Sequence, residues 1–288
     1  MLEISAATVM ELRKMSGQGM MDCKRALQEA NGDVEQAMDI LRKKGLATLA
    51  KRAGRDTSEG LVVCKSSDDG KTAAMATLCC ETDFVAKSDD FVATAQTLAD
   101  FALACPADEG AENLLETSVD GKKFNDILTE TVSKTGEKTQ VGDYTKYTLG
   151  GPGLIGTYIH FNEKVGTMVQ IETGDEATAN GDALKQAASD IAMHITATKP
   201  MALDKDQIDP ETIEREKAIF AEQMQGKPAN IIERIVEGKM KKFYAENCLL
   251  QQPFVKDDSK SVEQVLAEAA KQAGGEAKIR RFVRFEVG

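Results

Sequence analysis

An internal repeat in the middle of the chain constrains the fold more than any other feature. Residues 60–105 and 153–199 each read as a strand, a turn, a second strand and an amphipathic helix. An offset of 93 keeps the two segments in phase, pairing Gly60 with Gly153 and Met75 with Met168. A coincidental likeness between two such units is the alternative. The phase match favours two copies of one α+β subdomain, each a small antiparallel sheet backed by helices.

The first 55 residues predict a separate bundle of three short helices. Ser5 is typical of a helix cap, and a glycine-rich stretch ends the helix that it begins. A second helix is predicted from about Asp22 to Ala30. Asp33 caps a third helix, which we expect to end at Gly45 before a basic linker. This segment carries 10 basic and 7 acidic side chains in a chain of net charge −11, which favours a separate module.

Helical patterns resume after the second repeat. Asp209-Pro210 begins one helix, and Gly226-Lys227-Pro228 separates it from a second that runs from about Ala229 to Ala245. Two such helices joined by a tight turn predict an antiparallel hairpin. Ser261 then caps a helix, and a closing strand is expected to place four apolar residues on one face: Ile279, Val283, Phe285 and Val287.

We therefore predict an α+β fold in four units. The acidic stretch 106–122 is expected to be a loop within the second of them. The units are residues 1–55 (three-helix domain and linker), 56–148 (first core subdomain), 149–200 with 247–288 (second core subdomain) and 201–246 (inserted helical hairpin).

Composition excludes several classes of function. With 36 Lys and Arg against 47 Asp and Glu, the chain would repel nucleic acid and anionic membranes, so neither is expected as a partner. No apolar run approaches the roughly 18–20 residues of a membrane span. The first residues do not resemble an export signal, so we predict a cytoplasmic protein with its six cysteines reduced.

The sequence offers no constellation typical of an enzyme. GxSxG, HExxH and phosphate-loop motifs are absent, and the cysteines form no CxxC pair, so we expect no cofactor and no metal. The only two histidines are His160, at a predicted turn, and His194, beside an apolar helix stripe. A metal- or thiol-dependent enzyme would need both of them to meet the cysteines, so catalysis of a chemical reaction is not expected.

One aromatic residue resists a purely structural interpretation. Phe84 lies between a strand and a helix in the segment Thr82, Asp83, Phe84, Val85, Ala86 and Lys87. The aligned position of the second repeat is Ala177, so the fold itself does not require a large side chain there. A ring folded back onto its own helix is the alternative. An exposed aromatic flanked by an acid and a lysine is typical of an interface anchor.

The pair Met20-Met21 in the first domain is a second candidate. Methionines at the start of a helix in a small bundle are usually core residues, and adjacent positions cannot both face inward. We expect one of the two to be buried and the other to give a pliable binding surface beside the glycine loop.

With these residues in hand, the sequence resembles the bacterial translation elongation factor Ts family over essentially its whole length. The stretch ELRKMSGQGMMDCKRALQEANGDVEQAMDILRKKG resembles the family's N-terminal signature, and TDFVAK with the preceding Cys-Glu resembles its second signature. IAMHITATKP, QPFV and RFEVG match further segments. The resemblance implies an N-terminal domain like the ubiquitin-associated (UBA) three-helix fold, then two related α+β subdomains with an inserted helical hairpin.

The resemblance also implies a function and a partner. Members of the family bind elongation factor Tu, a GTPase, and promote release of GDP so that GTP can load, without making or breaking bonds. By residue match, Phe84 would wedge between helices of the partner and Asp83 would disturb the network around its Mg²⁺. Arg13, Met20 and Met21 match positions that face the GTPase domain, and His160 matches a histidine that lies toward the partner's other domains.

Two questions stay open at the level of sequence. Some family members continue past RFEVG into a further helix that touches the partner, and this chain stops at Gly288, so that contact is expected to be missing. A homodimer or a 2:2 complex with the partner is possible. The alternative function is a UBA-type protein-binding adaptor without exchange activity, which would use only residues 1–55.

Overall fold

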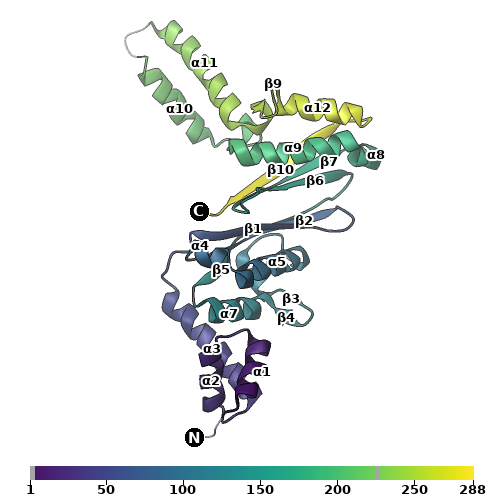
Figure 1. Ribbon diagram of the computed structural model, residues 1–288. Coiled ribbons are helices and arrows are strands. Elements are labelled where there is room, and N and C mark those ends of the chain that lie inside the picture. The colour runs from purple at the N-terminus through teal and green to yellow at the C-terminus, as the bar shows by residue number, and fades with distance from the viewer. Residues whose placement is uncertain (1–3, 225–227) are drawn as a thin grey trace.

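The computed structural model describes residues 4–224 and 228–288, and at its centre two antiparallel sheets lie face to face (Figure 1). The α+β prediction is therefore confirmed. Each sheet has three strands with the second strand of a hairpin in the middle. The first contains β1 (Glu59–Ser66), β2 (Thr72–Cys80) and β5 (Thr139–Thr148), and the other β6 (Gly153–Ile159), β7 (Val165–Thr173) and β10 (Ala277–Glu286).

The two sheets match each other down to their irregularities. The central strands β2 and β7 are both nine residues long and start 93 positions apart. The outer strands β5 and β10 are both ten residues long. The ladder of β2 with β5 shifts between Ala76 and Leu78, and the ladder of β7 with β10 shifts opposite Gln170 and Ile171, which align with Thr77 and Leu78.

Helices cover the outer face of each sheet and complete four layers (Figure 1). On the first sheet, α5 (Asp89–Ala104) packs on β1 and β2, and α7 (Phe124–Thr135) packs on α5 and β5. On the second, α9 (Asp182–Thr198) packs on β6 and β7, and α12 (Val262–Gln272) packs on α9 and β10. Ser88 caps α5, and Ser261 caps α12 through a capping box, which confirms the cap predicted at Ser261.

The inner faces of the sheets share one apolar cluster. Met75 and Met168, the aligned residues of the two central strands, are both fully buried there. Tyr147 of the outer strand β5 and Val287, just after the outer strand β10, belong to the same cluster. Because each sheet is apolar on both faces, neither could be stable in water without the other.

The predicted closing strand is present as β10, but the expectation that its four apolar residues share one face is wrong. Ile279 packs into the helix-side core, whereas Val283, Phe285 and Val287 contact the cluster between the sheets. The register of β10 shifts between Ile279 and Arg281. A β-bulge adds one residue to the strand and therefore moves the following side chains to the opposite face.

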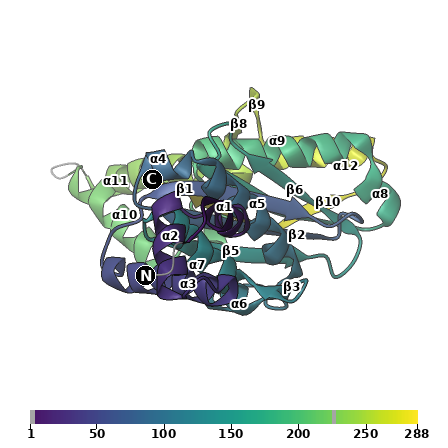
Figure 2. The same cartoon turned by 60° about the horizontal axis from the view of Figure 1, so that its bottom comes forward.

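The N-terminal helices pack around a small core of their own and dock on α7 (Figure 2). The predicted end of the third helix at Gly45 is wrong, because that helix runs unbroken into the expected linker. A Cβ on Gly45 would lie 2.7 Å from the carbonyl oxygen of Thr129 in α7, so glycine allows two helices to meet closely rather than ending one. The helices are α1 (Ala6–Ser16), α2 (Met20–Glu29) and α3 (Val34–Arg52).

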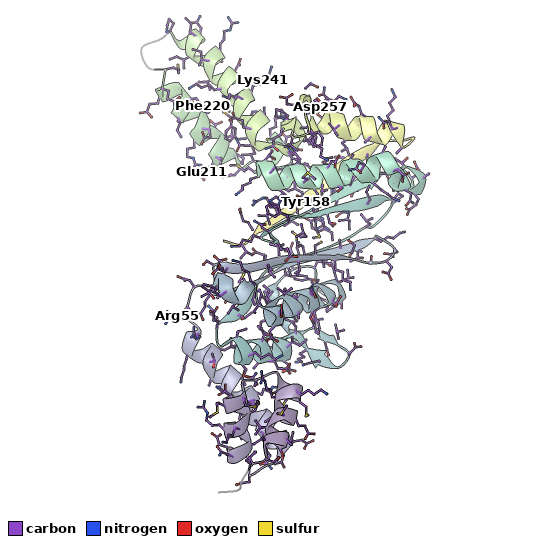
Figure 3. The ribbon with its side chains drawn as sticks, viewed as in Figure 1. Arg55, Tyr158, Glu211, Phe220, Lys241 and Asp257 are labelled. Carbon is purple, nitrogen blue, oxygen red and sulfur yellow. The ribbon has the colours of Figure 1, made fainter. Side chains whose placement is uncertain are left out.

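Two long helices extend from the other end of the molecule (Figures 1 and 3). They are α10 (Pro210–Glu222) and α11 (Ala229–Asn247), they pack on each other, and Lys239 lies over the Phe220 ring at 5.1 Å. Asp209 caps α10 and Pro210 is its first residue, as predicted. Gly226 and Lys227 of the predicted break lie outside the described residues.

Short elements occupy stretches that lack a clear sequence period. The acidic stretch 106–122 is not only a loop, because it contains a helix and most of a two-stranded hairpin. A short helix also precedes each of α5 and α9. The remaining elements are α4 (Asp83–Ala86), α6 (Ala111–Glu116), β3 (Ser118–Val119), β4 (Lys122–Lys123), α8 (Glu176–Asn180), η1 (Lys205–Gln207), η2 (Leu249–Gln251), β8 (Pro253–Phe254) and β9 (Asp257–Ser261).

Candidate functional site

The segment from Thr82 to Lys87, here called the Phe84 turn, presents its aromatic ring to solvent. Thr82 accepts a hydrogen bond from the Val85 amide and so caps the single turn of α4. Ala86 is buried and Val85 packs against the first core, which holds the turn in place from inside. Phe84 points the other way and is 83% exposed. The alternative of a ring folded back onto its own helix is therefore excluded.

Asp83 and Lys87 flank the ring as an ion pair. The Lys87 Nζ lies 2.8 Å from Asp83 Oδ2, across one helical turn. The hydrogen bond from Lys87 holds the pKa of the Asp83 carboxyl below its usual value, and the same contact raises the pKa of Lys87. Asp83 is therefore a carboxylate at neutral pH, and an exposed pair of this kind exchanges partners at little cost.

His160 lies in the turn between β6 and β7. Its backbone amide donates to Val165, and its Nδ1 lies 3.2 Å from the Tyr158 hydroxyl. The next residue, Phe161, is 89% exposed, and its ring centroid lies 4.4 Å from that of His160. This turn therefore carries a second exposed aromatic group.

The sequence reasoning missed Phe161, although a signal for it was available. The first repeat has Asp68 at the aligned turn position, so the fold needs no apolar side chain there. The same comparison that singled out Phe84 against Ala177 identifies Phe161 against Asp68. A large aromatic side chain that one repeat has, the other lacks and the fold leaves exposed is a candidate for an interface residue.

The Phe84 turn and the β6–β7 turn both lie beside the first part of β1. The Val62 amide donates to the Glu163 carbonyl at 2.7 Å, and Lys164 pairs with Glu59 at 2.6 Å. The α4 helix packs on the same strand, and Lys164 contributes to the lowered pKa of Asp83. The structure thus brings His160 and the Phe84 turn to one edge of the paired sheets.

The candidate residues of the first domain lie in a separate unit of the structure. Arg13 in α1 is exposed, and Met20 and Met21 at the start of α2 are 41% and 62% exposed. The expectation that one of the two methionines is buried is wrong. Gln18 is buried at this end of the bundle, and the inward face of α2 begins only at Cys23.

The two histidines do not meet each other or form a metal site. His194 is fully buried, receives a hydrogen bond from the Val255 amide on Nδ1 and contacts Gln252 through Nε2 at 2.9 Å. His194 therefore connects two of the segments that resemble the family, IAMHITATKP and QPFV, and its role in the fold is structural. Among residues 4–224 and 228–288, no group of three His, Cys, Asp or Glu is placed to hold a metal ion.

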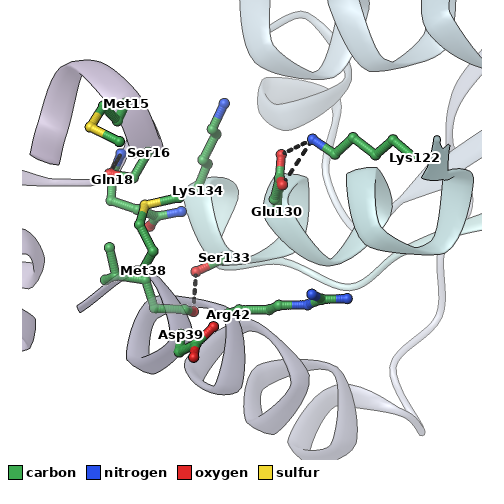
Figure 4. A pocket seen from close by; sticks show the side chains of 11 residues that line it. Met15, Ser16, Gln18, Met38, Asp39, Arg42, Lys122, Glu130, Ser133 and Lys134 are labelled. Atoms are coloured by element: carbon green, nitrogen blue, oxygen red, sulfur yellow. Dashed lines mark hydrogen bonds and ion pairs between the residues drawn. The ribbon is translucent and has the colours of Figure 1, made fainter. Parts of the chain in front are cut away.

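A cavity of about 350 Å³ lies between the N-terminal domain and α7 (Figure 4). Met15, Met38 and Gln18 line one side, and Lys134 and an ion pair of Lys122 with Glu130 line the other. Ser133 crosses it by donating to the Leu41 carbonyl. The two hydroxyl groups in its lining, of Ser16 and Ser133, both donate to backbone carbonyls.

No helix in the part of the chain that the structure describes is both long and apolar enough to cross a membrane.

Comparison with known proteins gives a consistent result. A family model described as "Elongation factor TS" matches residues 81–288. The whole chain is 46% identical to the elongation factor Ts of Nitratiruptor sp. and covers 94% of it. It is 41% identical over its whole length to the elongation factor Ts of Desulfovibrio desulfuricans, covering 99% of that protein. Over 99% of its length it is 42% identical to the elongation factor Ts of Clostridium kluyveri, covering 93% of it.

Proposed function

Because this chain belongs to the elongation factor Ts family, we propose that it is a guanine nucleotide exchange factor for elongation factor Tu. In this proposal it binds the GDP form of that GTPase and promotes GDP release, so that GTP can load during translation elongation. The physical basis is linkage. A partner that binds the nucleotide-free form more tightly must weaken nucleotide binding by the same factor.

The observation that carries the proposal is the Phe84 turn. Its backbone is fixed by the Thr82 cap and by Val85 and Ala86 in the core, while its ring is left 83% exposed. A rigid, exposed aromatic residue is suited to enter a pocket of a partner, because little conformational freedom is lost on binding. Phe84 acts here as the wedge between helices of the GTPase.

Asp83 supplies the second part of the proposed mechanism. Its carboxylate is charged at neutral pH and is held only by the exposed Lys87. When the ring enters the partner, Asp83 moves close to the network around the partner's Mg²⁺. That ion bridges phosphate oxygens in such GTPases, so disturbing its surroundings loosens the nucleotide.

The remaining candidate residues serve as additional contacts. Arg13, Met20 and Met21 of the first domain contact the GTPase domain, and the exposed methionines adapt to its surface. His160 faces the partner's other domains. We add Phe161 to the surface around His160 that contacts these domains, because the Phe161 ring is exposed beside His160.

In this proposal the protein is organised in the four units predicted from the sequence. Residues 1–55 form a UBA-like domain, residues 56–148 and 149–200 with 247–288 form the two core subdomains, and residues 201–246 are a hairpin inserted into the second. The proposed factor makes and breaks no bonds, needs no cofactor, acts in the cytoplasm and contacts neither nucleic acid nor membrane itself. Self-association into a homodimer or a 2:2 complex stays a prediction.

The decisive experiment is release of labelled GDP from elongation factor Tu with and without this protein. We expect catalytic amounts to accelerate release, while the protein alone neither binds nor hydrolyses GDP. Tight GDP binding by the isolated chain, or no acceleration, would contradict the proposal. Undiminished binding of a partner by residues 1–55 alone would favour the adaptor function, which leaves Phe84 without a role.

A further inference from the structure

Three segments meet behind the Phe84 turn, at the place where the N-terminal domain joins the core. They are the end of α3, the residues between β2 and α4, and the loop between α7 and β5. Arg55, just after α3, marks this place in Figure 3. We call the group Arg52, Glu81, Glu137 and Lys138 the junction.

Glu81 connects α3 to the start of the Phe84 turn. Arg52 Nη1 lies 2.9 and 2.7 Å from the two carboxylate oxygens of Glu81, and the Lys138 amide donates to the same carboxylate at 2.7 Å. Burial alone would raise the pKa of Glu81, but these hydrogen bonds outweigh it and lower the pKa. The Lys138 ammonium in turn donates to the Ala53 and Arg55 carbonyls, which fixes the end of α3.

Glu137 holds the cap of the Phe84 turn. It accepts hydrogen bonds from both the amide and the hydroxyl of Thr82, at 3.1 and 2.7 Å. Because the Thr82 hydroxyl donates to Glu137, its lone pairs are free to accept from the Val85 amide. The orientation of α4 therefore depends on a chain of contacts that runs from Glu137 through Thr82 to Val85.

The second repeat forms the same short helix without any of these groups. Its Asp175 caps α8 directly, through the Thr178 amide and hydroxyl. At the position of Glu81 it has Gly174. Glu137 lies two residues before the outer strand β5, and the residue two before the corresponding strand β10 is Gly275. Since it also has Ala177 in place of Phe84, the junction occurs only in the repeat that presents the aromatic ring.

We propose that Arg52, Glu81 and Glu137 are positioning residues for exchange, which hold the Phe84 turn in the orientation that the partner requires. Arg52 also makes that orientation depend on α3 of the N-terminal domain. The inference rests on the proposed exchange function and adds to it a route by which the N-terminal domain affects the release step as well as binding.

The chain offers a matched control for Arg52. Arg42 lies on the same helix and pairs with Asp126 of α7, so it also ties α3 to the core. That contact is made to the first turn of α7, and no hydrogen bond or ion pair joins Arg42 or Asp126 to the Phe84 turn. A residue that only docks the domain should behave like Arg42, whereas a positioning residue should act through Phe84.

The test is a double-mutant cycle measured on the full chain, with GDP release from elongation factor Tu at saturating factor as the readout. We expect Arg52→Met to lower the maximal release rate roughly tenfold or more, because small misplacements of a group that must fit a partner closely are costly. In a Phe84→Ala background the same substitution should have almost no further effect. Arg42→Met should change the maximal rate little, and equally in both backgrounds.

Two further variants keep the test decisive. Glu137→Gln replaces one of the two carboxylate oxygens that accept hydrogen bonds from Thr82 by an amide nitrogen. Like Arg52→Met, it should lower the maximal release rate in the unaltered background and have almost no further effect in the Phe84→Ala background. If Arg52→Met does not fold, Glu81→Gln replaces it, since the amide preserves the volume of the side chain. Independent effects of the junction variants and Phe84→Ala would overturn the inference while exchange by the unaltered protein stands. No release by the unaltered protein would instead refute the proposed function.

Discussion

At the scale of single residues, Phe84 and Phe161 leave two large apolar rings in water in the free protein. Burying an aromatic side chain of this size is favourable by about 1.5–3 kcal/mol. Neither ring is needed by the fold, because the aligned repeat positions are Ala177 and Asp68. The free energy of burying these rings is therefore available to a complex rather than to folding.

Replacing Phe84 by alanine should separate stability from function. We expect the free energy of unfolding to change by less than about 0.5 kcal/mol, as at other exposed sites. The complex should lose on the order of 2 kcal/mol, which corresponds to roughly a thirtyfold loss of binding or exchange efficiency. Asp83→Asn should slow exchange with less effect on complex formation. Melting and exchange are to be measured on the same samples, and a strongly lowered melting temperature with normal exchange would contradict the role of Phe84.

Phe161→Ala tests the second exposed ring. Here too thermal unfolding should be unchanged, while the dissociation constant of the complex rises about tenfold or more, as for interface aromatics. Met201→Ala is the control, because Met201 is also apolar and 58% exposed but lies before the helical hairpin. Equal losses of affinity in the two variants would show that the assay reports general surface apolarity and not a contact of the Phe161 ring.

At the scale of elements, the sequence predicts features that depend on neighbouring residues, such as the starts of helices. Ser88, Asp209 and Ser261 begin helices because their side chains satisfy free amides of the first turn. The end of α3 could not be predicted, since Gly45 serves a contact with α7 that only the folded chain has. The faces of β10 could not be predicted for a similar reason, because a bulge in its ladder breaks the alternation of side chains between the two faces of the sheet.

The candidate site likewise has a part that could be predicted from the sequence and a part that could not. The Phe84 turn could be found because the chain contains its own comparison in the second repeat. The contacts of Arg52 with Glu81 and of Thr82 with Glu137 could not, because they join residues 29 and 55 positions apart in the sequence. Long-range polar pairs of this kind leave no period or spacing in the sequence from which to predict them.

The link between α9 and the QPFV segment should make stability depend on pH. Burial lowers the pKa of His194 below its ordinary 6.5, although Gln252 opposes this. A neutral His194 accepts from the Val255 amide on Nδ1, and protonation there would break that bond. Since the unfolded chain binds the proton more tightly, stability should be unaffected above pH 6.5 and fall as the pH drops below it.

Chemical unfolding between pH 7.5 and 5 measures this effect. His194→Gln should be less stable than the unaltered protein at pH 7.5, and the difference should narrow toward pH 5. A His160→Gln variant serves as the comparison for loss of the other histidine. If the free energies of unfolding of His194→Gln and the unaltered protein differ by the same amount over this whole range, His194 contributes by packing alone.

At the scale of the whole molecule, the N-terminal domain is tied to the core at two places. Gly45 lets α3 lie directly on α7, and Arg52 and Lys138 fasten the end of that helix behind the Phe84 turn. The three N-terminal helices have an apolar core of their own, and the last of them also covers part of the larger core. Removing it should therefore affect both stability and the site.

Deletion of residues 1–55 tests this arrangement. Both sheets and their covering helices remain, so the truncated chain should still unfold in one cooperative transition. Its melting temperature should fall by on the order of 5 °C, because α7 loses its cover and the carboxylate of Glu81 loses the Arg52 guanidinium. Binding to elongation factor Tu should weaken with the loss of Arg13, Met20 and Met21, and the maximal release rate should fall as far as in full-length Arg52→Met. Loss of cooperative melting would place the domain boundary elsewhere, and an undiminished maximal rate would show that α3 does not act on the Phe84 turn.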